Sequence, residues 1–214
     1  MNLRINICIG ILGLLVSNML PGQDAQNAPI TAIAFVDEFP GRKDQYYNNW
    51  NRGEIHFTNG QKASNCLLRY HSRKDDLLWL RESDFKTGIV IKESIAAFKI
   101  ITEAGDSLHF VQYGDTSGLQ HHSIFLEVLA EGKLSFYCHR KVTYLKTSDD
   151  FVKRYQYYLR KDGLMHEVRF KKRAILTNFS EDEKKKLRQI MLENHLKFKN
   201  EYELAAGFEK FSEH

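Results

Sequence analysis

Cysteine and proline are scarce in this chain, with three residues of each among 214. The cysteines do not form a C-x-x-C pair or any other metal-ligand spacing, which excludes a zinc ribbon or a thioredoxin-like motif built on them. The motifs G-x-S-x-G and H-E-x-x-H are also absent, so neither a nucleophile elbow nor a zinc-protease helix is encoded. From this sequence we therefore predict no catalytic residue, no metal ligand set and no cofactor.

Long apolar runs are also lacking, apart from one near the N-terminus. The stretch Ile7–Val16 follows Arg4 and is uncharged, but it is too short to cross a bilayer comfortably as a helix. This pattern is typical of a secretory signal peptide over residues 1–22, with cleavage after Gly22 or after Ala25. We expect an exported protein, periplasmic or secreted, with no transmembrane span once the signal is removed. An uncleaved membrane anchor is the alternative interpretation.

Signal removal would leave two cysteines, Cys66 and Cys138. An oxidising compartment permits one intramolecular disulfide between them. The alternative is a pair of buried free thiols that behave as small apolar side chains.

Charge is unevenly distributed along the chain. The net charge is +4, and from Phe151 to the C-terminus fifteen Lys and Arg face ten Asp and Glu. Within this region Lys171, Lys172 and Arg173 are consecutive and could hold a phosphate or sulfate, because guanidinium donors match such oxygens. An exported basic segment favours anionic lipid, lipopolysaccharide or glycan, or an acidic protein face, and it does not favour nucleic acid. The alternative is a solvated strand-to-helix junction.

Alternating apolar residues and turn dipeptides dominate the middle of the chain. Gly53–Thr58 alternates and is followed by Asn59-Gly60, and Asp162-Gly163 separates two further alternating runs. Such dipeptides favour type I′ hairpin turns, which need positive φ at both positions. We predict a disordered leader at 23–30 and a mainly β domain at 31–178: an antiparallel, hairpin-connected sheet, sandwich or roll.

The hydrophobic period changes near Ser180. Ser180 and Glu183 have the spacing of a capping box, and Leu187, Ile190, Met191 and His195 then recur at helical intervals. A second helix is predicted after Asn200, which can cap it. Residues 179–214 are therefore expected to form a tail of two helices packed on the β domain.

Aromatic and polar side chains supply the remaining candidates. Tyr46, Tyr47 and Trp50 cluster among asparagines and could stack on a sugar or a protein groove, or could close the end of a sandwich. The adjacent pair His121-His122 lacks further metal ligands at a useful spacing. Asp115 stands in a D-T-S tripeptide, but an aspartic protease needs two such carboxylates, so a turn is the better interpretation.

Several segments together resemble a group of uncharacterised secreted bacterial proteins. They are Gly53–Gly60, Leu67–Tyr70, Asp76–Trp79, Phe125–Tyr137, and Leu192–Lys197 with Lys199–Glu201. The resemblance implies an exported, β-rich protein of the Gram-negative envelope. It brings no catalytic residue with it.

These observations favour a non-enzymatic exported module that binds a protein or an envelope component, in the periplasm or at the outer membrane. The alternative is an envelope enzyme acting on glycan or peptide through carboxylates in loops. A third hypothesis is a structural subunit of an envelope complex.

Overall fold

The structure is a computed structural model that describes residues 28–36, 49–114 and 123–213. The predicted signal peptide, Tyr46, Tyr47, Asp115 and the His121-His122 pair lie outside these ranges. The strands are β1 Ala32–Val36, β2 Asn51–Phe57, β3 Lys62–His71, β4 Asp76–Arg81, β5 Lys86–Val90, β6 Ile95–Ile101, β7 Ser107–Gly114, β8 Ser123–Ala130, β9 Leu134–Leu145, β10 Asp150–Lys161 and β11 Leu164–Val168. The α-helices are α1 Lys172–Leu176, α2 Glu181–Glu193 and α3 Glu201–Glu213.

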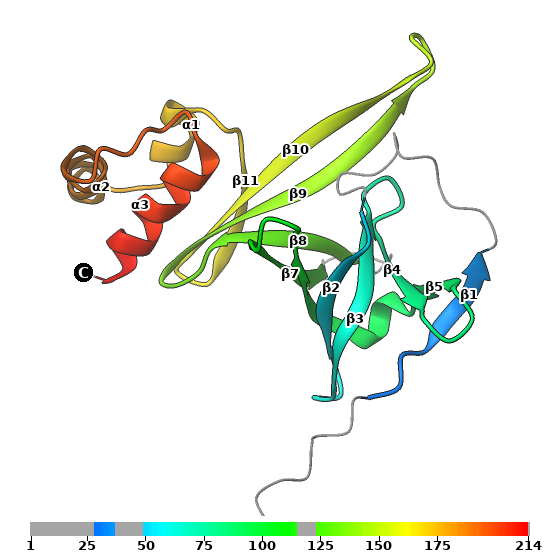
Figure 1. Cartoon of the computed structure of the whole chain (residues 1–214). Coiled ribbons are helices and arrows are strands. Elements are labelled where there is room, and N and C mark those ends of the chain that lie inside the picture. Colours follow the sequence, from blue (N-terminus) through cyan, green and yellow to red (C-terminus); the bar gives the residue numbers. More distant parts are fainter. Residues whose placement is uncertain (1–27, 37–48, 115–122, 214) are drawn as a thin grey trace, which may run out of the picture.

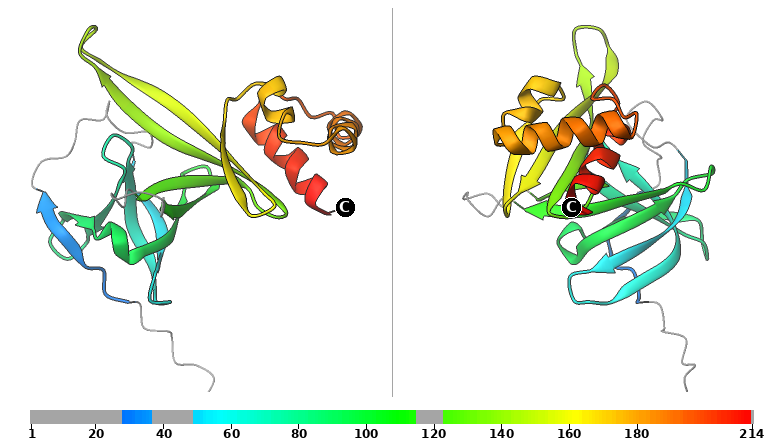
Figure 2. Two further views of the ribbon diagram at one scale, coloured as in Figure 1. Left: turned by 180° about the vertical axis from the view of Figure 1, so that it is seen from behind. Right: turned by 90° about the vertical axis from the view of Figure 1, so that its left-hand side faces the viewer.

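All eleven strands belong to one antiparallel sheet, in the order β1-β5-β4-β3-β2-β6-β7-β8-β9-β10-β11. Figures 1 and 2 show the sheet curling through β2 to β8, while β9 and β10 form a long hairpin that leans across it. The three helices gather at one end, beside β8 to β11. The predicted fold class, mainly β with C-terminal helices, is therefore confirmed, and of the predicted forms it is a rolled single sheet.

The two turn dipeptides behave differently. Asp162 and Gly163 both have positive φ, 51° and 80°, as a type I′ turn requires. At the first hairpin only Gly60 does, with φ 82°, and pairing resumes only between His56 and Lys62. The hairpin was predicted correctly there, but its turn is not the predicted type I′. The N–H of Phe57 donates to the carbonyl of Gln61 at 2.9 Å, so residues 58–60 form a loop that is one residue longer than a type I′ loop.

The rolled sheet encloses an aromatic core. Tyr70, Phe98, Phe110 and Phe125 are all fully buried, and the rings of Phe98 and Phe110 stack with centroids 4.6 Å apart. Aromatic pairs of this kind stabilise the fold beyond what the burial of their apolar area contributes. Ala28, at the end of the predicted disordered leader, also joins this core, and its N–H donates to the carbonyl of Lys62 at 2.9 Å.

Asp75 closes the roll. It lies in the turn between β3 and β4, and its carboxylate accepts the backbone N–H of Phe125 on β8 at 3.2 Å. It also accepts hydrogen bonds from the Lys92 ammonium and the Tyr70 hydroxyl. The His139 imidazole on β9 lies 3.6 Å from the same carboxylate. Burial opposes ionisation of this carboxyl, but the hydrogen bonds and the charge of Lys92 outweigh it and lower its pKa. One side chain thus joins strands that are far apart in sequence.

Two glycines allow close approach of backbone or helix. Gly53 on β2 is buried, and a Cβ there would collide with the Lys99 carbonyl on β6 and stand 2.9 Å from a methyl of Leu68. Gly207 on α3 lies against the Met191 sulfur on α2, where a Cβ would collide with it. Glycine therefore occupies this helical position despite its low helix propensity, because it allows the two helices to pack closely.

We expect Gly53→Ala to lower the free energy of unfolding by about 2 kcal/mol, because an added methyl in a full core forces backbone shifts. Urea denaturation followed by tryptophan fluorescence measures this. Gly114→Ala is the comparison, since a Cβ there meets nothing within 4 Å and its backbone is not in the left-handed region. Equal costs for both variants would contradict the close approach of β2 and β6.

The C-terminal helices follow the sequence prediction with two corrections. The capping box at Ser180 and Glu183 is present, and Leu187, Ile190 and Met191 are buried. His195 is exposed, with φ 55°, beyond the end of α2. The helical part begins earlier than residue 179, because α1 starts at Lys172 and is too short to show a helical period in the sequence.

A buried ion-pair cluster fastens this helical part to the sheet. Arg140 on β9 is 0% exposed, and its guanidinium bonds to Glu127 on β8 at 2.6 Å and to Glu201 on α3 at 2.9 Å. The Tyr157 hydroxyl donates to Glu201 as well, at 2.6 Å. One guanidinium thus joins the buried Glu127 carboxylate of the sheet to the partly exposed Glu201 carboxylate, which ties the start of α3 to the sheet.

Cys66 and Cys138 are both free thiols. Cys66 borders the aromatic core, whereas Cys138 belongs to the separate core under the helices. Burial raises the pKa of the Cys66 thiol to about 11. The structure thus matches the second sequence interpretation, two thiols that pack as small apolar side chains, and it does not contain the disulfide.

Candidate functional site

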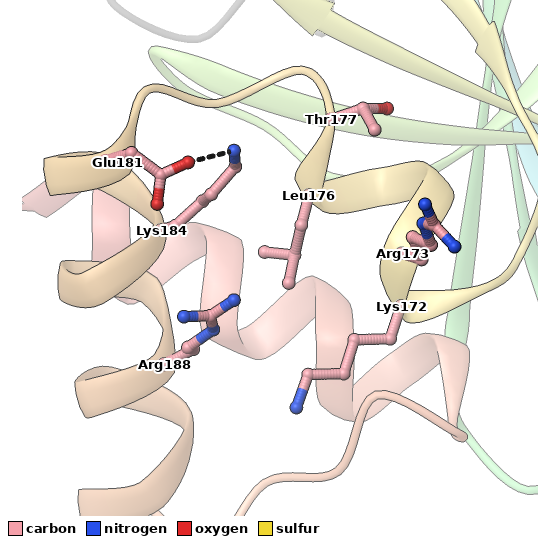
Figure 3. A pocket seen from close by; sticks show the side chains of 7 residues that line it. All are labelled: Lys172, Arg173, Leu176, Thr177, Glu181, Lys184 and Arg188. Carbon is pink, nitrogen blue, oxygen red and sulfur yellow. Dashed lines mark hydrogen bonds and ion pairs between the residues drawn. The ribbon is translucent and has the colours of Figure 1, made fainter.

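One hollow of the helical part lies between α1 and α2, and we call it the basic groove. Its volume is about 470 Å³, and its lining residues are Lys172, Arg173, Leu176, Thr177, Glu181, Lys184 and Arg188. Figure 3 shows Lys172 and Leu176 reaching from α1 towards α2, and Lys184 and Arg188 reaching back. Four of the seven residues are cations and one is an acid, so the groove is strongly positive.

The local sequence explains this geometry. Ile175 and Leu176 are buried and hold α1 on the core, which leaves Lys172 and Arg173 exposed on the first turn. On α2 the capping box and buried Leu187 set the helix rotation, and the i, i+4 residues Lys184 and Arg188 then share the face towards α1. The basic groove is therefore produced by two helices whose apolar sides are committed to the core.

Its single acid is neutralised within the groove. Lys184 donates to Glu181 at 2.7 Å, and this hydrogen bond lowers the pKa of Glu181. Among the described residues, Arg173 and Arg188 form no ion pair. The groove therefore retains at least two guanidinium groups and one ammonium group that can meet an incoming anion.

A second hollow adjoins the first, and Lys172 lines both. This lysine-rimmed groove is lined by Phe170, Lys171, Lys172, Leu196, Lys197, Phe198 and Lys199, with a volume of about 930 Å³. Its three apolar side chains are half-buried, and the Lys172 ammonium lies 5.1 Å from the centroid of the Phe198 ring. None of these lining residues is acidic.

The predicted site residues thus fall into two groups. The structure brings Lys171, Lys172 and Arg173 together with further cations at the two grooves. Trp50 is half-buried beneath the Arg69 guanidinium, whose carbon lies 4.4 Å from the ring centroid. Its predicted neighbours Tyr46 and Tyr47 lie outside the described residues, so the aromatic site stays a prediction.

Sequence reasoning missed Arg188, Lys197 and Lys199. These residues lie on other elements than Lys171–Arg173, and only the packing of α1 against α2 and the following loop brings them close. A signal was present on α2, where Lys184 and Arg188 have the spacing of one helix face.

Other kinds of site find less support in the part of the chain that is described. Within residues 28–36, 49–114 and 123–213, no three His, Cys, Asp or Glu side chains gather to hold a metal ion. The closely placed carboxylates Glu127 and Glu201 are bonded to one buried guanidinium instead of facing each other across an open cleft. None of the described helices is long and apolar enough to cross a membrane.

Comparison of the chain with protein-family models, with curated proteins and with solved structures gives no match in any of the three. The resemblance to exported envelope proteins therefore stays a prediction.

Proposed function

We propose that this protein is an exported, non-enzymatic binding module of the Gram-negative cell envelope, and that its basic groove binds phosphate groups of anionic lipid. One observation carries the proposal: Lys172, Lys184 and Arg188 face one hollow between α1 and α2, Arg173 lines its α1 side, and its single acid is paired with Lys184. Guanidinium groups bind phosphate oxygens in bidentate fashion, and lysine adds a mobile point charge.

The apolar part of the groove supports lipid over a free polar anion. Leu176 and the neighbouring lysine-rimmed groove place apolar side chains beside the cations. A basic surface with adjacent apolar groups is typical of proteins that lie on anionic membranes. The N-terminal signal pattern supports the location in the envelope, because it would bring the chain to such lipids.

The rolled sheet supplies the rigid support for this surface. Arg140 joins α3 to β8 and β9, and the Met191 side chain on α2 packs against α3 at Gly207. The basic groove is therefore carried on elements fastened to a packed core, as a preorganised binding site requires.

We expect the purified protein to sediment with phosphatidylcholine vesicles that contain phosphatidylglycerol and not with phosphatidylcholine alone. Each Lys or Arg near an anionic surface contributes about 1 kcal/mol, so the double variant Lys172→Gln/Arg188→Gln should bind roughly thirtyfold more weakly. Vesicle co-sedimentation across a lipid titration gives the affinities.

The matched control is Lys133→Gln/Lys185→Gln, which removes the same charge from the β8–β9 turn and from the outward side of α2, where the Lys185 side chain is 77% exposed. Equal weakening in both double variants would contradict a localised groove and leave only a general charge effect. Turnover of an envelope glycan or peptide by the purified protein would contradict the non-enzymatic part of the proposal.

A further inference from the structure

We infer that the lysine-rimmed groove receives an acyl chain, so that the protein holds one anionic amphiphile with its phosphate in the basic groove. This inference rests on the proposed function and extends it from phosphate binding to recognition of a single lipid molecule. The juxtaposition of a cationic and an apolar compartment that share Lys172 carries the argument.

The floor of the lysine-rimmed groove is apolar and accessible. Phe170, Leu196 and Phe198 pack against the core under the helices on one side, yet each remains only half-buried. Partly exposed aromatic and aliphatic side chains that line one hollow leave apolar area for a ligand to cover. Its volume of about 930 Å³ lies within the range of small-molecule sites.

The rim of this groove selects the charge of the occupant. Lys171, Lys172, Lys197 and Lys199 surround the apolar floor, and no ion pair with an acid is formed by these lysines in the described part of the chain. Lysine stems can lie along an apolar chain while their ammonium groups stay in water. An amphiphile with an anionic head fits this arrangement, whereas a cationic or uncharged one leaves the ammonium groups uncompensated.

Monomeric alkyl phosphates of increasing chain length, kept below their micelle concentrations, test the inference by isothermal titration calorimetry on the whole protein. We expect each added methylene to strengthen binding about threefold to fourfold, the effect of burying one CH₂. Alkyl trimethylammonium ions of equal length should not bind. Binding of alkyl phosphates that does not change with chain length would overturn the acyl-chain inference while leaving the proposed function intact.

The variant Phe198→Ser should abolish most of the dependence on chain length and keep the affinity for the shortest alkyl phosphate. Phe211→Ser is the matched control, because Phe211 is also half-buried against the same core and also lies beneath a lysine, with the Lys186 ammonium 4.7 Å from its ring centroid. Loss of chain-length dependence in both variants alike would overturn the inference, since Phe211 lines neither groove.

A photoreactive alkyl phosphate with a terminal diazirine tests the unmodified protein and does not depend on the folding of a variant. We expect the label on Phe170 or on residues 196–199. Labelling elsewhere would overturn the inference. Failure of every alkyl phosphate and of anionic vesicles to bind would overturn the proposed function together with it.

Discussion

Replacement of Arg140 by methionine should lower the free energy of unfolding by about 3–5 kcal/mol, because it leaves a buried carboxylate without its cation. Glu127 is only 2% exposed, and the Arg140 guanidinium lies 2.6 Å from it. Burial opposes the charge on Arg140, but the hydrogen bond and charge of Glu127 outweigh it and raise the pKa of the guanidinium. Chemical denaturation of the purified variant measures the loss.

A second variant separates the missing charge partner from the lost packing. In Glu127→Gln/Arg140→Met no uncompensated charge remains at the fully buried position, and side-chain volume is nearly kept. Glu201 also loses its cation, but its side chain is 15% exposed, so we expect more than half of the lost stability to return. Glu201 keeps its hydrogen bond from Tyr157 in both variants. If the double variant is no more stable than Arg140→Met, the cost comes from packing and not from the buried charge.

Loss of Arg140 should also affect the proposed site. Glu201 stands at the start of α3, and its contact with Arg140 fixes that helix on β9. Because α2 packs on α3 through Met191 and Gly207, loosening α3 changes the support of the basic groove. The double variant regains stability but still lacks the contact between Arg140 and Glu201. Vesicle binding that is weakened in Arg140→Met and stays weakened in the double variant would therefore show that this contact positions the groove.

Local features of the fold could be predicted from the sequence because they depend on neighbouring residues. The turn at Asp162-Gly163 needs only two residues that tolerate positive φ, and the capping box at Ser180 and Glu183 is complete within four positions. The closure of the roll could not be predicted, because Asp75 finds Phe125 fifty positions away. Nothing in the local pattern distinguishes Asp75 from an ordinary turn aspartate.

The candidate site also has one part that is local in the sequence and another part that only folding brings together. Lys171, Lys172 and Arg173 are adjacent in the chain, so their charge was visible before folding. The full grooves need Arg188 from α2 and Lys197 from the following loop, which are set beside them by tertiary packing alone. The apolar floor was hidden for the same reason, since half-buried aromatic residues look like core residues in a sequence.

Asp75→Asn is the other substitution with a large expected effect. It should lower the free energy of unfolding by about 2–4 kcal/mol, because the amide cannot compensate the Lys92 ammonium or accept all the same hydrogen bonds. Asparagine tolerates the φ of 59° found at this position, so backbone strain does not contribute. Urea denaturation at neutral pH measures the loss.

The sheet contains its own control for this substitution. Asp149, in the turn between β9 and β10, also has positive φ and also accepts the hydroxyl of the tyrosine five residues before it, Tyr144. That tyrosine is 41% exposed, whereas Tyr70 beside Asp75 is fully buried. Asp149→Asn should leave the free energy of unfolding nearly unchanged, because water replaces what the exposed carboxylate supplies. A similar loss in both variants would mean that the local turn, and not the closure of the roll, determines the cost.

The pH dependence of the free energy of unfolding tests whether Asp75 stabilises the fold in its ionised form. Its pKa is lowered in the folded protein, so its stabilising effect is present above the unfolded value of about 3.9 and is lost as pH falls through the folded value. The pKa of Glu54 is also lowered, to about 2, by the hydrogen bonds from Lys62 and His56, but Glu54 is present in the wild type and in the variant, so its titration cancels in the difference. The stability difference between wild type and Asp75→Asn should therefore be constant above pH 5 and shrink below about pH 4. A difference that stays constant down to pH 2 would contradict an ionised Asp75 at the centre of the closure.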